Sequence, residues 1–367
     1  MPFVHLGRQH AELAEELLAV VNGVLAASDA GHAAEVEAFE REFAEFCGAE
    51  FAVGVASGTA ALSLGLIAAG IGPGDEVILP AYAPITAALG VLHAGATPVL
   101  CDVRADTGLI DTTSAAELVG KRTAAIVAVH LFGQVCDMQR LGEFAERHGL
   151  LIVEDAAEAH GASFAGARAG SFAEVAAFSF HPRRNLGTVG NGGAVCTGDP
   201  AIADRVRRLR DLGQRELGEH VEVGFEAGLD GLQAAVLRVK LRHLEQKNAA
   251  RRAWANMYRA VLPGNVTTLW EDPRGECVYH LFPVRIANRD AVLAGLRRAG
   301  IAAGVHYDPP LHVQPPLIGH RIAHVGVGAS EEWSEEELSL PMFAELTVEE
   351  VRRVADALES TLERTAP

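Results

Sequence analysis

Between residues 51 and 155 the sequence alternates between short apolar segments and helical patterns, and this alternation constrains the fold more than any other feature. Short apolar segments of this length predict buried strands, and the patterns between them predict helices. Such alternation favours a mostly parallel sheet covered by helices, with ligands at the carboxyl ends of the strands. The predicted strands are 51–56, 76–79, 97–101, 124–130 and 150–154, and the predicted helices are 58–70, 86–93 and 138–148.

Helical patterns also occur on both sides of this region. Residues 8–48 predict two amphipathic helices, and 200–262 is rich in helical patterns. A chain of 367 residues exceeds the roughly 250 to 300 residues that one core usually holds. We therefore expect a large domain over 1–245, with the N-terminal helices and the cleft, and a small α/β domain over 246–367. The patterns that predict this small domain are a strand at 277–286, a helix at 291–299, a proline- and histidine-rich loop at 306–316, an acidic segment at 331–337 and a helix at 348–362.

Composition argues against several classes of protein. The net charge of -17 opposes binding to nucleic acid or to an anionic membrane surface. The five cysteines have no paired spacing, so neither a disulfide framework nor a metal site is predicted, and the cytoplasm is the expected compartment. No apolar run of about 18 residues occurs, and the N-terminus has no basic segment followed by an apolar one. Neither membrane spanning nor export is predicted.

Two polar segments directly follow predicted strands. Ser57-Gly58-Thr59 precedes a helix, whose free N–H groups suit a phosphate, although such a segment is more often only a helix cap. Val-Glu-Asp-Ala-Ala-Glu-Ala-His-Gly at 153–161 places carboxylates at the end of another strand. These carboxylates could cap a helix, remain solvated or act in catalysis.

The order of the motifs resembles that of the DegT/DnrJ/StrS family of sugar aminotransferases, which are pyridoxal-phosphate enzymes. This resemblance covers nearly the whole chain and implies the aspartate-aminotransferase fold (fold type I). In that fold a large α/β/α domain with a mostly parallel sheet precedes a smaller α/β domain. The motifs are Gly-Thr-Ala-Ala-Leu at 58–62, Pro-Ala-Tyr at 80–82, His-Leu-Phe-Gly-Gln at 130–134, Glu-Asp-Ala-Ala-Glu-Ala-His-Gly at 154–161, Leu-Asp-Gly-Leu-Gln-Ala-Ala at 229–235 and Leu-Ser-Leu-Pro-Met at 338–342.

The resemblance also implies contacts to the cofactor. Asp155 would face the pyridine nitrogen, where a carboxylate strengthens the ring as an electron sink. Glu158 would lie near the ring hydroxyl. The phosphate would be held by Gly58, Thr59 and Ser179.

Further residues are implied on the substrate side and across a dimer. His306, Tyr307 and His312 would face the substrate. Active sites of the family are shared across a homodimer, and Glu226 would point toward the phosphate of the neighbouring subunit. This position usually holds an asparagine, and Gly228 stands where an arginine is usual, so both departures weaken the expected phosphate contact.

The largest departure from the family pattern is Arg184. It stands where the pattern Ser-Phe-x-Pro-x-Lys-Asn-Leu-Gly carries the Schiff-base lysine. A guanidinium does not deprotonate in proteins, so it cannot supply the free amine that attacks an aldehyde. The three lysines of the chain, Lys121, Lys240 and Lys247, lie outside the cofactor motifs. A flat side chain that would stack on the cofactor ring is replaced as well, by Pro84.

Four functional hypotheses remain open. The first is an enzyme that acts by acid/base chemistry, without a covalently bound cofactor, on a small sugar-like or amino-containing metabolite in specialised or cell-surface biosynthesis. Its acid/base groups would be Asp155, Glu158, His160 and His181, with Arg184 as an anion clamp.

The other three hypotheses differ in their use of the cofactor. One is a nucleotide-sugar dehydratase that holds pyridoxamine phosphate non-covalently. Another is a pyridoxal-phosphate-dependent sugar aminotransferase, for example in antibiotic biosynthesis. The last is a non-catalytic binding or regulatory subunit.

Overall fold

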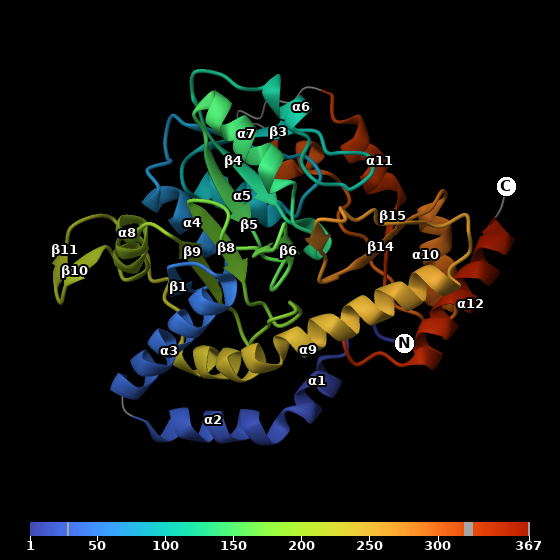
Figure 1. The fold of residues 1–367 in the computed structure, drawn as a ribbon, viewed down its shortest axis with the longest axis horizontal. Coiled ribbons are helices and arrows are strands. Elements are labelled where there is room, and N and C mark those ends of the chain that lie inside the picture. The colour runs from blue at the N-terminus through green and yellow to red at the C-terminus, as the bar shows by residue number, and fades with distance from the viewer. Residues whose placement is uncertain (28, 319–325, 366–367) are drawn as a thin grey trace.

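A seven-stranded sheet forms the centre of the larger part of the molecule, with the strand order β1-β9-β8-β5-β4-β2-β3. The computed structural model describes residues 1–27, 29–318 and 326–365 (Figure 1). Neighbouring strands pair in parallel, except that β9 runs antiparallel to β1 and β8. The predicted mostly parallel sheet is thus confirmed. The strands are β1 (Phe51–Val55), β2 (Glu76–Pro80), β3 (Thr97–Cys101), β4 (Thr123–Val129), β5 (Leu151–Asp155), β8 (Val175–Ser179) and β9 (Gly193–Thr197).

Helices pack along this sheet. α4 (Gly58–Ala68) contacts β8 and β9 and is apolar nearly all round, as expected of a helix with little exposed surface. α7 (Met138–His148) packs on β5. The remaining helices of this part are α1 (Leu6–Glu12), α2 (Ala14–Ala26), α3 (Asp29–Cys47), α5 (Ile85–His93), α6 (Thr112–Ala116) and α8 (Pro200–Arg210).

The long helix α9 (Gly231–Val261) connects the two parts of the molecule (Figure 1). It begins at Asp230, whose carboxylate accepts the backbone N–H groups of Leu232 and Gln233. The predicted boundary between residues 245 and 246 falls inside this helix, and the division into two domains stays a prediction. The C-terminal part contains α10 (Arg289–Arg298), α11 (Gly328–Glu336) and α12 (Val348–Thr365) around a three-stranded sheet of β12 (Thr267–Thr268), β14 (Phe282–Arg285) and β15 (Glu337–Leu340).

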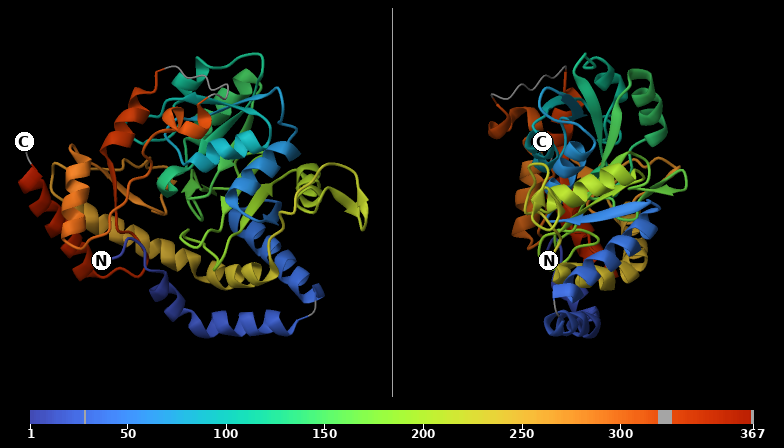
Figure 2. Two further views of the ribbon diagram at one scale, coloured as in Figure 1. Left: turned by 180° about the vertical axis from the view of Figure 1, so that it is seen from behind. Right: turned by 90° about the vertical axis from the view of Figure 1, so that its left-hand side faces the viewer.

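Short elements complete the fold. The hairpin of β10 and β11 projects from the body of the molecule (Figure 2). A small three-stranded sheet with the order β13-β6-β7 brings together two distant parts of the chain. These elements are β6 (Ser163–Phe164), β7 (Ala167–Arg168), β10 (Gln214–Glu216), β11 (Glu219–His220), β13 (Gly275–Glu276) and the 3-10 turns η1 (Leu131–Gly133), η2 (Leu311–Val313) and η3 (Pro315–Leu317).

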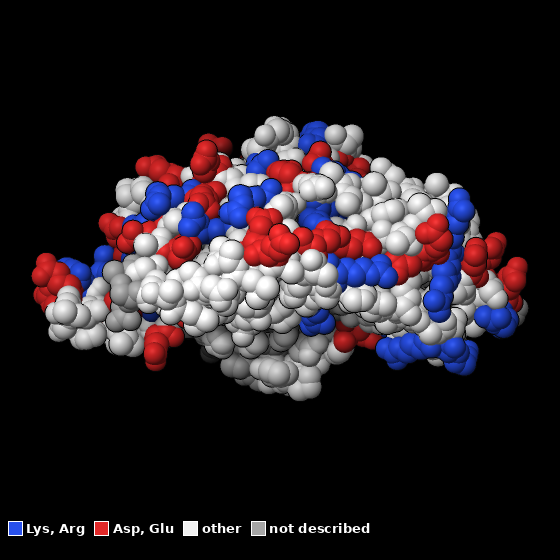
Figure 3. Space-filling model, turned by 90° about the horizontal axis from the view of Figure 1, so that it is seen from below, with Lys and Arg blue, Asp and Glu red and all other residues white. Residues whose placement is uncertain are grey.

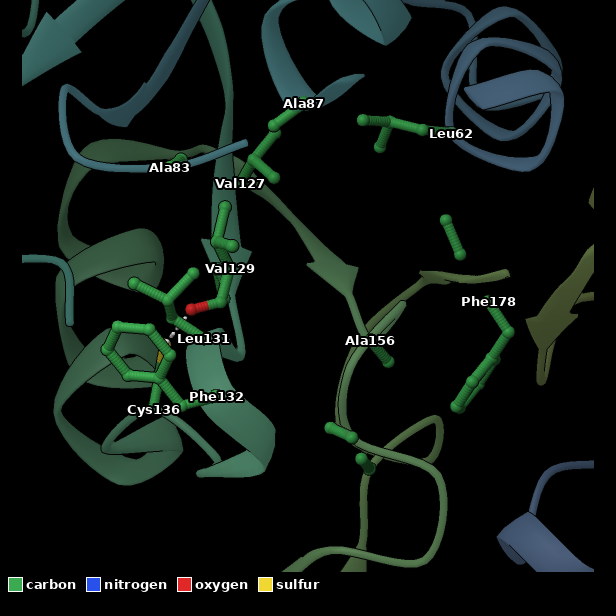
Figure 4. Packing of buried hydrophobic residues seen from close by; sticks show 14 of the residues in the cluster. Leu62, Ala83, Ala87, Val127, Val129, Leu131, Phe132, Cys136, Ala156 and Phe178 are labelled. Atoms are coloured by element: carbon green, nitrogen blue, oxygen red, sulfur yellow. Dashed lines mark hydrogen bonds between the residues drawn. The ribbon is translucent and has the colours of Figure 1, made fainter. Parts of the chain in front are cut away.

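The core lies between the sheet and its helices. Phe178 on β8 and Val127 on β4 are both buried in it (Figure 4). The thiol of Cys136 donates to the carbonyl oxygen of Val129 at 3.3 Å, drawn as a dashed line in Figure 4. All five cysteines are buried and free. No helix in the described part of the chain is long and apolar enough to cross a membrane, and no group of three or more His, Cys, Asp or Glu side chains there could hold a metal ion.

Two local predictions differ from the structure, and one segment without a predicted element receives one. Residues 8–48 were expected to form two helices, but a break at Leu13 divides the first into α1 and α2. The strand expected at 277–286 is confined to β14, because Tyr279 has a positive φ of 44° that interrupts an extended chain. The acidic segment at 331–337 ends α11 and begins β15.

Candidate active site

A cavity of about 450 Å³ opens where the carboxyl ends of the strands meet the C-terminal part. Its volume lies within the roughly 300 to 1,000 Å³ typical of small-molecule sites. It lies at the edge of the sheet where the alternating pattern predicted ligands. The residues expected in the site that line it are Gly58, Thr59, Asp155, Ser179, His181, Arg184, His306 and Tyr307.

One end of the cavity is formed by the start of α4. Ser57 caps this helix by accepting the N–H of Ala60 at 3.1 Å. A Cβ on Gly58 would stand 2.5 Å from Cβ of Ser179, so the absence of a side chain lets the two segments approach closely. A Cβ on Gly193 would stand 2.4 Å from the carbonyl oxygen of Ser57. Tight packing therefore fixes the helix N-terminus at the cavity, where its N–H groups favour an anion.

Asp155 ends β5 and lines the cavity. Its Oδ1 accepts the N–H of Ala157 at 3.2 Å. Burial raises the pKa of this carboxyl group, and the Ala157 N–H and the positive charge of Arg184 act in the opposite direction. The Asp155 carboxylate is thus placed to accept a hydrogen bond from a protonated nitrogen of a ligand.

Arg184 enters the cavity from the loop between β8 and β9, with its side chain 15% exposed. Its Nη1 lies 2.9 Å from Oε1 of Glu158 and 2.7 Å from Nε2 of His280. Although burial opposes the charge, the neighbouring groups, with Glu158 first among them, more than compensate, and the pKa of the guanidinium is raised. Within the described residues, Nε and Nη2 have no hydrogen-bond partner, so this part of the guanidinium is available to an anionic ligand.

The contact with Arg184 also fixes the tautomer of His280. Arginine only donates, so Nε2 of His280 accepts, and its Nδ1 carries the proton toward Oδ1 of Asn185 at 3.4 Å. Burial lowers the pKa of His280 well below its ordinary value, and Arg184 adds to this effect. Asn185 also donates to Asn248 on α9 at 3.0 Å. On the side away from Glu158, Arg184 is therefore held by a neutral network of His280, Asn185 and Asn248.

Glu158 joins three segments beneath the cavity. Its Oε1 accepts the hydroxyl of Tyr307 at 2.7 Å in addition to Arg184, and its Oε2 accepts the N–H of Phe132 at 2.7 Å. Burial raises the pKa of Tyr307 well above its ordinary value, and Glu158 adds to this effect. Tyr307 is thus a neutral donor at neutral pH. Glu158 contacts the cavity through Arg184 and Tyr307.

Besides Glu158, three residues expected in the site do not line this cavity. His160 packs against the rings of Phe178 and Phe180, and burial lowers its pKa to about 3. His312 lies 3.1 Å from Glu331 through its Nε2. The backbone of Glu226 forms an isolated antiparallel β-bridge with that of Asp211, and both residues line a separate groove. The predicted contact of Glu226 concerns a neighbouring subunit and stays a prediction.

Sequence analysis missed several residues that line the cavity. Phe3 and Val4 come from the N-terminal segment, which is held at the C-terminal part because the carbonyl oxygen of Met1 accepts the N–H of Ala302 at 3.0 Å. His280 follows Tyr279, which interrupts the expected strand, and also lines the cavity. Asn191 is another of the residues that line the cavity. Of these residues, only Asn191 lies in a sequence pattern that could have indicated it, a glycine-rich turn.

Besides the departure at Arg184, the residues present fit a phosphorylated pyridine cofactor in two respects and depart in one more. The N-terminus of α4 with Ser179 offers a seat for a phosphate, and Asp155 offers a carboxylate for a ring nitrogen. Pro84 lines the cavity where a flat side chain would stack. Such a cofactor, when bound, supplies an electron sink for chemistry at an amine-bearing carbon.

Comparison with known proteins identifies relatives of this chain. The sequence pattern of the DegT/DnrJ/EryC1/StrS aminotransferase family matches residues 11–359. The dTDP-3-amino-3,4,6-trideoxy-alpha-D-glucose transaminase of Streptomyces venezuelae is 42% identical over 370 residues, covering 99% of this chain and 97% of the relative.

Two solved structures are also similar. DesV of S. venezuelae in complex with a ketimine intermediate has a TM-score of 0.94 and 41% identity, with 99% of each chain covered. NtdA of Bacillus subtilis with bound cofactor PMP has a TM-score of 0.91 and 27% identity, covering 99% of this chain and 85% of the other. The expected aspartate-aminotransferase fold is confirmed. The chain belongs to the DegT/DnrJ/EryC1/StrS family of pyridoxal- or pyridoxamine-phosphate-dependent aminotransferases.

Proposed function

We propose that this protein acts on a nucleotide-linked sugar as an aminotransferase-type enzyme, and that it holds pyridoxal or pyridoxamine phosphate without a covalent bond. Arg184 carries this proposal, because it occupies the cavity at the sequence position of the family's Schiff-base lysine. None of the three lysines lines the cavity. The ammonium group of Lys240 instead donates to the carbonyl oxygen of Gly187 at 2.7 Å.

Arg184 is proposed to act as an anion clamp. Its Nη1 is fixed by Glu158 and His280, so the remaining donors keep a constant direction. A planar guanidinium suits a phosphate or carboxylate better than a single ammonium does. Asp155, Gly58, Thr59 and Ser179 are proposed to hold the cofactor, and Tyr307 and His306 to face the sugar.

The relatives favour amino transfer over the cofactor-free acid/base enzyme that sequence analysis placed first. The S. venezuelae relative is named as a transaminase of a dTDP-linked amino sugar, and the cavity keeps the carboxylate and the phosphate seat that the cofactor requires. The pyridoxamine-phosphate-dependent dehydratase stays a second candidate, because it too needs no lysine. His181 lines the cavity and would be its acid/base group.

The first test examines covalent attachment in the unmodified protein. The full-length protein is incubated with excess pyridoxal phosphate, treated with borohydride and mapped by peptide mass spectrometry. We expect no adduct at a cavity residue, because a guanidinium cannot form the bond. An adduct on any of the three lysines that forms in stoichiometric amount would contradict the proposal. Absorbance titration of the same sample measures non-covalent binding.

A homodimer in the cytoplasm is also proposed. Exposed apolar side chains lie on α2, on the projecting hairpin and on the segment after it, including Leu25 at 74%, Leu217 at 99% and Val223 at 89% exposure. Figure 3, which views the molecule from below, shows charged side chains mainly in the upper part and a broad area without them beneath. Light scattering during size exclusion is expected to give about twice the chain mass of 38.7 kDa. A monomeric mass at micromolar concentration would contradict this prediction.

A further inference from the structure

A chain of hydrogen bonds leads from a buried carboxyl group to the wall of the cavity. Glu337 begins β15 and is fully buried. Its Oε2 accepts the backbone N–H of His306 at 2.6 Å, and its Oε1 is hydrogen bonded to the hydroxyl of Ser339. Oγ of Ser339 lies 2.9 Å from Nδ1 of His306, and His306 is one of the residues that line the cavity.

This chain has two consistent arrangements of protons, because a serine hydroxyl carries a single hydrogen. If Glu337 is ionised, Ser339 donates to it and accepts from Nδ1 of His306, which leaves Nε2 as an unprotonated base. If Glu337 is protonated, it donates to Ser339, Ser339 donates to Nδ1, and Nε2 carries the hydrogen. The imidazole is neutral in both arrangements.

We propose that Glu337, Ser339 and His306 form a proton relay that lets a neutral His306 accept or deliver a proton at Nε2 inside the cavity. When Nε2 takes up a proton, the Nδ1 proton moves to Ser339, and the hydroxyl proton of Ser339 moves to the Glu337 carboxylate. The imidazole changes tautomer, and only the carboxyl group changes charge. The relay would serve the proton transfers of the proposed function and in that sense rests on it.

The surroundings of His306 hold its ring in place for this role. The ring stacks on Phe3, with centroids 5.5 Å apart and an interplanar angle of 20°. A Cβ on Gly304 would stand 2.7 Å from Cε1 of His306, so a larger residue there would displace the ring. The carbonyl oxygen of His306 accepts the hydroxyl of Tyr82. Nε2 has no hydrogen-bond partner within the described residues.

The charged neighbours fit a relay in which, as the pH falls, the Glu337 carboxylate takes up a proton before the His306 imidazole does. Burial raises the pKa of Glu337 to about 8, with Ser339, the His306 N–H and Arg289 opposing the shift and Glu158 adding to it. Burial lowers the pKa of His306 to about 4, where Glu158 opposes and Arg183 and Arg184 add to the shift. An imidazolium at this position is therefore disfavoured at neutral pH.

The tautomer of His306 can be measured directly by NMR in the ligand-free, full-length protein with ¹⁵N-labelled histidine. Comparison with a His306→Gln variant assigns its signals among the 15 histidines. We expect the Nε2–H tautomer below the pKa of Glu337 and the Nδ1–H tautomer above it, with a midpoint near 8. A single tautomer from about two pH units below to about two above this midpoint would overturn the relay. This readout does not depend on cofactor or sugar binding.

Two variants separate the relay from mere packing. In Glu337→Gln the amide mimics the protonated carboxyl group, because its oxygen accepts the His306 N–H and its NH₂ group donates to Ser339. We expect the Nε2–H tautomer at every pH above the pKa of the His306 imidazole. Ser339→Ala should abolish the pH-dependent switch, whereas Ser330→Ala should retain it. Ser330 is a matched control because its buried hydroxyl donates to another carboxylate, Asp102, at 2.7 Å. A Glu337→Gln variant that switches like the unmodified protein would also overturn the relay.

Discussion

Replacing Arg184 by lysine is expected to give the protein a covalent, borohydride-reducible bond to pyridoxal phosphate, where the unmodified protein forms none. A lysine at this position would lie in the cavity beside Glu158 and could offer a free amine, which a guanidinium cannot. We expect apparent affinity for pyridoxal phosphate to rise at least about tenfold, which corresponds to about 1.4 kcal/mol. Absorbance titration and peptide mapping of residue 184 measure the two effects.

The neighbouring Arg183 provides a matched control for this experiment. Arg183 also lines the cavity, whereas the ion pair with Glu158 is made by Arg184, and Arg183→Lys introduces an amine one residue away. We expect no preferential adduct at position 183. Equal labelling of both variants would indicate non-specific reaction of an accessible lysine. If the Arg184→Lys variant folded but formed no adduct at residue 184, the cavity would not admit an aldehyde at this position, and the proposed cofactor site would be wrong.

The parts of the fold that sequence predicted well are those with strong local patterns. The strand Thr97–Cys101 and the helix Met138–His148 match the predicted bounds, because a short buried strand and an amphipathic helix each carry a distinct periodicity. The break at Leu13 was not predicted, since apolar residues continue across it. The end of the strand before Phe282 depends on the positive φ of Tyr279, which a bulky side chain gives no reason to expect.

The candidate site was predictable only where its residues follow strands or belong to family motifs. Asp155 and Ser179 end strands that meet at one edge of the sheet, so their common location follows from topology. Phe3 and His280 reach the same cavity through packing between distant segments, which no local pattern records. His160 lies in the same motif as Asp155, yet its ring packs among phenylalanines, because motif membership does not fix the direction of a side chain.

Glu154→Ala is expected to lower the free energy of unfolding by roughly 3 to 5 kcal/mol, the largest stability loss that we predict. The fully buried Glu154 carboxylate accepts the N–H groups of Gly170, Phe172 and Ala173 at 2.8, 2.9 and 3.1 Å. It also lies 3.0 Å from Nε2 of His130. Alanine would leave all four donors without their acceptor inside the core, and each unsatisfied buried group is costly.

A second contact of the His130 ring shows which partner donates the hydrogen bond between His130 and Glu154. The N–H of Cys136 donates to Nδ1 of His130 at 3.2 Å, so Nε2 carries the proton and donates to the carboxylate. Glu154→Gln should lower the free energy of unfolding less than Glu154→Ala does. Its amide oxygen can still accept a hydrogen bond, although its NH₂ group would face another donor. Urea unfolding followed by circular dichroism measures both losses, and Glu50→Ala on the exposed surface serves as the control. A loss for Glu154→Ala no larger than that of the control would mean that the 170–173 segment finds other acceptors, and Glu154 would then not be what holds this segment beside β5 and Asp155.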